Sequence, residues 1–407
     1  SHQKETNEQG GKLMLHRTER TLENIPVGSL GMIPIDGCQE LGGKVNDYLV
    51  KWRKEAVAKT KDDVVFHDYQ KETYIIDAKV PRFGSGEAKG IINESVRGKD
   101  IYLMVDVCNY SLTYSLSGHT NHMSPDDHFQ NLKRVIAAIG GKARRINVIM
   151  PFLYESRQHK RSSRESLDCA LALQELVRMG VDNIITFDAH DPRVQNAIPL
   201  SGFETVRPTY QFIKGLLQNV PDLKIDSEHM MAISPDEGAT GRAIYLANVL
   251  GLDMGMFYKR RDYTRIVDGR NPIVAHEFLG SSVEGKDVII IDDMISSGDS
   301  ILDVAKQLKA RKANRIFAAA TFGLFTNGMK KFDEAYEQGI IHGILTTNLI
   351  YQTPELLSKP YYINCDLSKY IALIVDTLNH DGSISSILSP NERIQNVVKK
   401  YRNGEKI

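Results

Sequence analysis

The chain has 407 residues, which is long for one ordinary hydrophobic core and favours two domains. Apolar residues make up 42% and charged residues 25%, as in globular proteins, and the formal net charge is +0. This balance excludes a general attraction to nucleic acid or anionic membranes, and no stretch approaches the ~20 apolar residues of a membrane-spanning helix.

Taken in chain order, residues 1–27 contain more charged than apolar residues and predict a mobile extension or a peripheral helix, without a signal-peptide core. After it, short apolar runs alternate with amphipathic segments. The runs that predict strands are Ile101–Val105, Ile146–Met150, Ile184–Phe187, Met230–Ile233, Val288–Ile291 and Ile316–Ala320. Helical periods lie between several of them, at Phe129–Ile139, Ser166–Met179, Gly241–Leu250 and Ile301–Leu308. Continuous apolar strands separated by helices indicate parallel sheets covered on both faces, so the fold class is α/β.

A weak internal repeat joins two of these regions. The tripeptide Gly-Lys-Asp precedes a strand at 98–100 and again at 285–287, and each strand is followed by a helix and by a strand that begins with arginine. Any two βαβ units look somewhat alike, but the shared order favours duplication of one domain. The two halves would meet near residues 200–210, and a cleft between domains is a common ligand site. The predicted division is an extension at 1–27, domains at 28–205 and 206–390, and a tail at 391–407.

The most informative motif is VIIIDDMISSGDS, residues 288–300. A buried strand ends in two acids, Asp292 and Asp293, and a segment rich in hydroxyl groups leads into a helix. Backbone N–H groups, the positive helix end and the serine hydroxyls would converge on a phosphate. Open α/β sheets bind ligands at the carboxyl ends of their strands, where the two acids could reach ribose hydroxyls. The loop is not a Walker A motif, because no Gly-Lys-Ser/Thr closes it.

This run resembles the PRPP-binding signature of the type I phosphoribosyltransferase fold, in which two acids precede an Asp-Thr pair and a Gly-Thr pair. Ser296 replaces the usual Asp and Asp299 replaces the usual Gly. An inward Asp299 would repel a phosphate unless a cation or lysine compensates. The alternative is an ordinary helix cap made by Asp299 or Ser300. The resemblance implies that ribose 5-phosphate binds at Asp292, Asp293, Ser296, Ser297, Gly298, Asp299 and Ser300.

Beyond the loop, residues 30–390 resemble the ribose-phosphate pyrophosphokinase (PRPP synthetase) family. The matching segments, in the family's order, are GEAKGIINESVRGKDIYL (86–103), PFLYESRQHKRSSRES (151–166), ITFDAH (185–190), SPDEGATGRA (234–243) and YKRRDYT (258–264). The resemblance implies two tandem type I phosphoribosyltransferase-like domains with central, mostly parallel sheets flanked by helices. It also implies a ribose-phosphate diphosphokinase, which transfers the β,γ-diphosphoryl group of ATP to the anomeric hydroxyl of ribose 5-phosphate and gives PRPP and AMP.

The resemblance also assigns roles to single residues. The matches are Lys259 and Arg261 for catalysis; Phe83, Ser85, Glu87, Arg157 and Gln158 for ATP; and His190, Asp236 and Asp188 for the metal. A point charge and a guanidinium fork suit the spread negative charge of phosphoryl transfer, although a solvated basic run is the alternative for the two cations. Carboxylates suit Mg²⁺, the expected cofactor, and Asp188 could bind the metal or orient His190.

The expected partners are ATP, ribose 5-phosphate and further copies of the chain, in dimers or a hexamer, with no nucleic acid or membrane. Residues 261–287 are longer than the corresponding mobile loop of the family, and Arg265 or Arg270 could add charge there. A regulatory or structural paralog without turnover is the alternative, motivated by Asp299, Ser296 and Ser85, which stands where the family usually has Asp. A phosphoribosyltransferase is weaker, because the duplicated half would have no role.

The four cysteines are far apart, with no CxxC pair and no spacing typical of zinc sites; they are Cys38, Cys108, Cys169 and Cys365. Such cysteines are expected to be buried reduced thiols. With the absence of a signal-peptide core, they predict a cytoplasmic protein.

Overall fold

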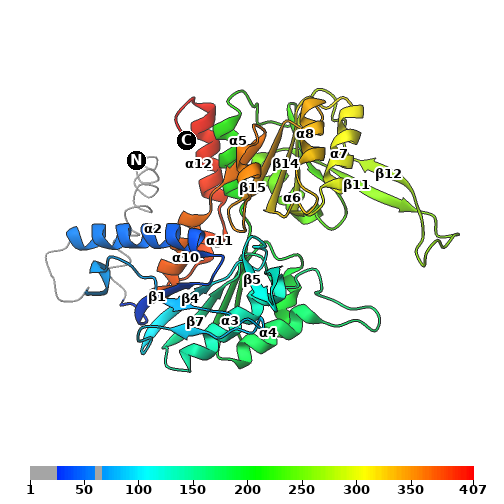
Figure 1. Cartoon of the computed structure of the whole chain (residues 1–407). Coiled ribbons are helices and arrows are strands. Elements are labelled where there is room, and N and C mark those ends of the chain that lie inside the picture. The colour runs from blue at the N-terminus through cyan, green and yellow to red at the C-terminus, as the bar shows by residue number, and fades with distance from the viewer. Residues whose placement is uncertain (1–24, 60–66) are drawn as a thin grey trace. The chain divides into compact units, whose positions relative to one another are not determined.

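A computed structural model describes residues 25–59 and 67–407, which form two compact units (Figure 1). Unit 1 runs to Val206 and also contains Leu349–Tyr351 and Leu367–Leu388. Unit 2 contains Arg207–Asn348, Gln352–Asp366 and Ser389–Ile407. The segment 367–388, which the sequence-based division placed with the C-terminal half, therefore packs with the first unit. The predicted extension at 1–27 lies almost wholly outside the described residues.

Unit 1 is built on a five-stranded parallel sheet with the order β1-β4-β7-β8-β9. Its strands are β1 (Ser29–Pro34), β4 (Lys99–Met104), β7 (Arg145–Ile149), β8 (Asn183–Phe187) and β9 (Gly202–Val206). Residues 74–76 pair with the other side of β1, where the Met32 amide donates to Tyr74 O and the Ile76 amide donates to Met32 O, both at 2.8 Å. After β1 the chain therefore moves to residues 74–76 on one side of this strand. It then reverses, and β4, β7, β8 and β9 follow one another on the other side of β1.

Helices cover both faces of this sheet because of that reversal. Right-handed crossovers place α3 (Pro125–Ile139) and α4 (Asp168–Arg178) on one face and α2 (Gln39–Ala58) on the other. Figure 1 shows α2 beside α10 (Ser368–Asn379) on one side of the strands, with α3 and α4 on the opposite side. The shorter elements are η1 (His67–Gln70), β2 (Ala78–Lys79), β3 (Ile91–Ile92), β5 (Thr113–Leu116), β6 (His119–His122), η2 (Pro192–Ala197) and α11 (Ser385–Leu388).

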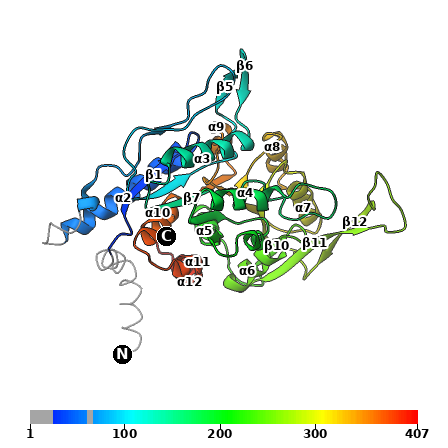
Figure 2. The ribbon, with the colours of Figure 1, turned by 90° about the horizontal axis from the view of Figure 1, so that it is seen from below.

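Unit 2 contains a seven-stranded sheet with the order β12-β11-β10-β13-β14-β15-β16, in which only the pairing of β11 with β12 is antiparallel. The strands are β10 (Met230–Ser234), β11 (Asp253–Arg261), β12 (Ile273–Leu279), β13 (Asp287–Ile295), β14 (Ile316–Gly323), β15 (Gly343–Thr347) and β16 (Tyr362–Cys365). The β11–β12 ribbon projects from the rest of this unit in both Figures 1 and 2.

The two faces of the second sheet bury different helices. Met231 and Ile233 of β10 pack in the core with α7 (Asp299–Ala310), α8 (Lys330–Glu337) and α9 (Pro354–Ser358). Met230 and Ala232 pack with α5 (Thr209–Asn219), α6 (Thr240–Leu250) and α12 (Asn391–Arg402). Because alternate residues of a strand point to opposite faces, continuous apolar runs such as β10 supply both cores. Residues 391–407, treated as a tail in the sequence, contribute buried Ile394 to the second core.

The α/β class predicted from the sequence is confirmed, and every predicted strand and helix is present within a few residues of its expected bounds. Both halves of the predicted repeat are parallel strand–helix–strand units, β4-α3-β7 and β13-α7-β14. The four cysteines are free thiols, of which Cys108 is half-buried and the others are buried. Across residues 25–59 and 67–407, helices with the length and apolar character needed to span a membrane are absent.

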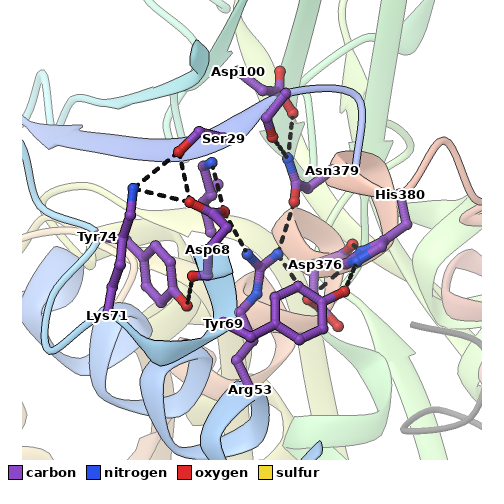
Figure 3. Close-up of polar contacts among 12 residues, drawn as sticks. Ser29, Arg53, Asp68, Tyr69, Lys71, Tyr74, Asp100, Asp376, Asn379 and His380 are labelled. Atoms are coloured by element: carbon purple, nitrogen blue, oxygen red, sulfur yellow. Dashed lines mark hydrogen bonds and ion pairs between the residues drawn. The ribbon is translucent and has the colours of Figure 1, made fainter. Parts of the chain in front are cut away.

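A buried polar cluster fixes α10 against the N-terminal part of unit 1 (Figure 3). The Arg53 side chain of α2 is 2% exposed and lies 3.2 Å from Asp376, 3.3 Å from Asp68 and, as a donor, 2.8 Å from Asn379 Oδ1. Asn379 Nδ2 in turn donates to Asp100 Oδ2 of β4 at 3.0 Å. Burial disfavours the charged guanidinium, but Asp376 and the neighbouring acidic groups outweigh burial and raise the pKa of Arg53. This cluster, together with apolar side chains of α10 such as Tyr370, whose ring lies 6.5 Å from that of Phe187 in β8, joins residues 367–388 to unit 1.

Candidate functional site

The carboxyl ends of β10 and β13 lie side by side in unit 2. The chain passes from β10 to β11 on one side, whereas β14 and β15 follow β13 on the other. Helix α6 follows β10 and helix α7 follows β13, and these two helices pack in the cores on opposite faces of the sheet. The boundary between β10 and β13 is therefore a topological switch point, the place where open α/β sheets bind ligands.

Carboxylates gather at this boundary. Asp292 and Asp293 lie within β13, which continues to Ile295, and not at its end as the sequence suggested, because residues 294–295 still pair with β14. Asp236 follows β10 and accepts a hydrogen bond from the Ala239 amide at 2.9 Å, at the start of α6. The structure thus brings a residue predicted for the metal next to two residues predicted for ribose 5-phosphate.

Asp292 lies among other carboxylates in a largely buried position. Burial raises the pKa of Asp292, and the adjacent Asp293 and Asp236 carboxylates raise it further. A divalent cation would relieve this crowding, and the hard oxygen donors fit Mg²⁺. Within the part of the chain that the structure describes, there is no group of three or more His, Cys, Asp or Glu side chains arranged to hold a metal. Mg²⁺ commonly uses one or two carboxylates and completes its shell with water and phosphate oxygens.

The predicted phosphate loop connects β13 to α7 through residues 296–298. Gly298 is the N-cap of α7 and has φ = 90°, a left-handed conformation that favours glycine. The loop is fixed at its start by the Thr326 amide, which donates to Ser296 O at 2.9 Å. The N–H groups of the first turn have no acceptor inside a helix, so those of Ser300 and Ile301 can serve an anion.

Asp299 does not cap the helix. It occupies the first helical position, its own amide donates to Ser297 Oγ at 3.3 Å, and its carboxylate lies 2.8 Å from Lys331 Nζ on α8. The side chain is half exposed, and the hydrogen bond from Lys331 lowers its pKa. The alternative of a cap made by Asp299 is therefore wrong, and a lysine compensates the unusual carboxylate. Ser300 makes no side-chain cap either, since the cap residue is Gly298.

Replacement of Gly298 by alanine is expected to destabilise unit 2 by about 2–3 kcal/mol. An added Cβ would lie 2.2 Å from Phe332 Cζ and would also occupy a left-handed backbone conformation. Urea denaturation of the variant measures the loss. Gly285→Ala is the matched control, because Gly285 has φ = 73° but no atom within 4 Å of the added Cβ. Equal losses in the two variants would contradict the role of the Phe332 contact.

The predicted catalytic cations lie on β11, beyond the residues that pair with β10. Lys259 pairs with His276 and Arg261 with Ile273 in the antiparallel ladder of β11 and β12, with a register shift just before Arg261. Both side chains are exposed, and Arg261 Nη1 donates to Asn271 O at 3.1 Å. β11 runs parallel to β10, so these cations extend from the same edge of the sheet as Asp236.

The residues predicted for ATP lie in unit 1. Phe83, Ser85 and Glu87 are exposed on one tight turn, in which the Phe83 amide donates to Glu87 O at 2.8 Å. Arg157 and Gln158 follow β7; Arg157 is exposed, and Gln158 Nε2 donates to Ser166 O at 2.6 Å.

His190 and Asp188 follow β8, the neighbour of β7 in the sheet. Asp188 is 5% exposed and has φ = 42°. The ring centroids of His190 and His159 are 5.4 Å apart, so the segments after β7 and β8 meet. The predicted metal residues are thus divided, with Asp188 and His190 in unit 1 and Asp236 in unit 2.

Lys331 and Phe332 were not predicted to take part in the site. They begin α8 and reach the loop only through tertiary structure, at Asp299 and Gly298 respectively. An exposed lysine and a helical phenylalanine carry no distinctive pattern in the sequence. The one feature of the sequence that could have predicted a lysine near the loop is Asp299, because a negative charge in a phosphate loop requires a compensating cation.

Comparison with known proteins identifies relatives of this chain. A family model for the N-terminal domain of ribose phosphate pyrophosphokinase matches residues 31–180, and one for the phosphoribosyl synthetase-associated domain matches residues 270–389. The ribose-phosphate pyrophosphokinases of Vibrio parahaemolyticus and Vibrio cholerae are 28% and 29% identical over 318 residues, 77% of this chain and 91% of each relative. The crystal structure of phosphoribosylpyrophosphate synthetase from Mycobacterium smegmatis matches with a TM-score of 0.68 at 20% identity, over 87% of this chain and 100% of that one, which confirms the tandem fold expected from the sequence. The chain belongs to the ribose-phosphate pyrophosphokinase family.

Proposed function

We propose that the protein is an active ribose-phosphate diphosphokinase, which transfers the β,γ-diphosphoryl group of ATP to the anomeric hydroxyl of ribose 5-phosphate and releases AMP. The observation that carries the proposal is the switch point of unit 2. There, the loop before α7, the carboxylates of Asp236, Asp292 and Asp293, and the strand that bears Lys259 all belong to one edge of one sheet. Family membership supports the same reaction.

The loop would bind the phosphate of ribose 5-phosphate. The N–H groups at the start of α7 and the positive end of the helix favour an anion, and the hydroxyls of Ser297 and Ser300 can donate to phosphate oxygens. Asp292 and Asp293 can accept hydrogen bonds from ribose hydroxyls, which would fix the orientation of the sugar. The pairing of Asp299 with Lys331 reduces the repulsion that this carboxylate would exert on the phosphate.

Lys259 and Arg261 would stabilise the negative charge that spreads over the transferred group. The rate gain would come mainly from positioning and charge neutralisation, since diphosphoryl transfer needs little covalent work from the protein. Mg²⁺, held through Asp236 and the β13 carboxylates of unit 2, would neutralise phosphate oxygens. ATP would be bound by Phe83, Glu87, Arg157 and Gln158 of unit 1.

A coupled assay of AMP release with purified protein, ATP and ribose 5-phosphate tests the proposal. Release of AMP that depends on both substrates and on Mg²⁺ is the expected result. No release over a range of Mg²⁺ and inorganic phosphate concentrations would instead favour a paralog that has kept the fold and lost turnover. Release of pyrophosphate from PRPP and a base would favour a phosphoribosyltransferase.

Lys331→Ala is expected to raise the KM for ribose 5-phosphate by ~3-fold, because it leaves the Asp299 carboxylate uncompensated beside the bound phosphate. Asp299→Asn is expected to change KM little, and adding it to Lys331→Ala should restore binding. Lys330→Ala is the matched control, an exposed lysine adjacent in α8. Steady-state kinetics at low salt measures the effect; an unchanged KM in Lys331→Ala would show that Asp299 does not influence the ligand.

A further inference from the structure

The turn that carries Phe83 and Glu87 has a well-defined internal structure. In addition to the bond between the Phe83 amide and Glu87 O, the Gly86 amide donates to Phe83 O at 2.9 Å, and Arg82 forms an antiparallel bridge with Ala88. The Phe83 side chain remains 51% exposed. These bonds fix the conformation of the turn. They do not fix its direction relative to the sheet of unit 1, which requires contacts with other elements.

A second element, the β5–β6 hairpin, supplies such contacts. Figure 2 shows this hairpin standing out beyond α3. Ser117 and Gly118 connect its strands, with φ = 50° and 83°, as in the two-residue type I′ turns that match the twist of a hairpin. The Ser117 amide donates to Gly84 O at 2.8 Å. Gly86 approaches the hairpin so closely that an added Cβ would lie 3.0 Å from Leu116 Cδ1.

Arg82 and Tyr114 connect the turn and the hairpin to α3. The Arg82 guanidinium lies 4.0 Å from the centroid of the Tyr114 ring and donates to Gly86 O at 2.7 Å. The Arg82 side chain is 11% exposed, and its Nη2 is 3.7 Å from Asp127 in the first turn of α3. The Tyr114 hydroxyl lies 3.3 Å from both carboxylate oxygens of the same Asp127. A stacked, largely desolvated guanidinium is held much more firmly than a solvated one.

Asp127 is itself fixed in place. It forms a capping box with Ser124, whose amide donates to Asp127 Oδ2 at 3.0 Å and whose hydroxyl accepts from the Asp127 amide at 3.2 Å. The chain of contacts therefore runs from the rigid start of α3 through Tyr114 and Arg82 to the backbone of the turn.

We propose that Tyr114 and Arg82 are positioning residues for the nucleotide, which they serve by holding the Phe83–Glu87 turn against the β5–β6 hairpin. This inference rests on the proposed function, because it takes the turn as the site of contact with the base. A mobile Phe83 would have to be ordered when the nucleotide binds, and that entropy cost would appear in the affinity for ATP. Ribose 5-phosphate, bound by unit 2 residues, would not be affected.

Tyr114→Leu is expected to raise the KM for ATP by ~10-fold, with kcat and the KM for ribose 5-phosphate within about 2-fold of wild type. Tyr114→Phe keeps the stacked ring and is expected to restore a nearly normal KM. Tyr110→Leu is the matched control, since the Tyr110 ring packs 5.6 Å from Tyr351 and not on Arg82. Hydrogen exchange of residues 82–89 should accelerate in Tyr114→Leu only.

A normal KM for ATP together with unchanged hydrogen exchange in Tyr114→Leu would overturn the inference. So would an equal rise in both KM values, which indicates a general structural defect. If the wild-type protein releases no AMP, the proposed function fails separately. Calorimetric titration of wild type and Tyr114→Leu with ATP and Mg²⁺ then decides the inference, and equal affinities, or no binding to either protein, would reject it.

Discussion

Lys259→Ala is expected to lower kcat by ~10²-fold or more while the KM values for ATP and ribose 5-phosphate change far less. The lysine lies at the end of β11 on the edge of the sheet that carries Asp236 and the phosphate loop. A point charge that meets the substrate mainly as negative charge spreads in the transition state contributes to kcat and little to binding. Steady-state measurement of AMP release with each substrate varied in turn tests this.

Arg260→Ala is the matched control for Lys259. Arg260 is the next residue of the same strand, 62% exposed, and pairs with Glu277 of β12 at 3.3 Å. Its removal is expected to leave kcat nearly unchanged, which separates loss of the lysine charge from distortion of the hairpin. Near-normal turnover in Lys259→Ala would remove this lysine from the mechanism, and equal losses in both variants would point to damage of β11 and β12.

Arg53→Met is expected to destabilise unit 1 by about 3–5 kcal/mol. Arg53 lies between Asp68 and Asp376, and methionine would fill part of its volume while leaving Asp376 without its arginine. Asp68 would keep Lys71, whose Nζ lies 2.9 Å away. The loss should be concentrated in α10, because Asp376 and Asn379 of that helix both contact the guanidinium. Urea denaturation followed by circular dichroism, with hydrogen exchange of residues 368–379, measures it.

Lys54→Met provides the comparison for Arg53. Lys54 is the next residue of α2 and pairs with Glu72 at 2.7 Å, but both side chains are substantially exposed. Removing an exposed pair is expected to cost under ~1 kcal/mol. Adding Asp376→Leu to Arg53→Met should recover part of the lost stability, since one unpaired buried carboxylate is removed. A loss in Arg53→Met no larger than that in Lys54→Met would show that the cluster does not hold α10.

The fold class could be predicted because it follows from local patterns of apolar residues in the sequence. Runs such as VIII at 288–291 are apolar at every position, as expected of a strand buried on both faces, and the intervening helices favour parallel pairing. The hairpins β5–β6 and β11–β12 were not predicted. Strands β5 and β6 are short and largely exposed, and β11 pairs with β12 partly along its exposed, charged end at 259–261, so periodicity gave little signal for either hairpin.

The candidate site was predicted in part. The run from Asp292 to Ser300 was identified from its composition, since acids and small hydroxyl residues before a helix suit a sugar phosphate. The sequence left the direction of Asp299 open, because a helix start can place that carboxylate toward the ligand or toward solvent. Lys331, 32 residues further along the chain, decides it.

The sequence by itself determined the α/β class, the positions along the chain of the strands that carry the motifs, and the chemical character of the loop after β13. Each of these depends on neighbouring residues alone. Tertiary structure decided that β10 and β13 are adjacent, which brings Asp236 to Asp292, and that residues 367–388 join unit 1, where Asp376 pairs with Arg53. These outcomes depend on burial and charge pairing between residues distant in the chain. Such pairing cannot be predicted from local periodicity, because the sequence around an arginine in a helix does not identify the distant residues that contact it in the folded chain.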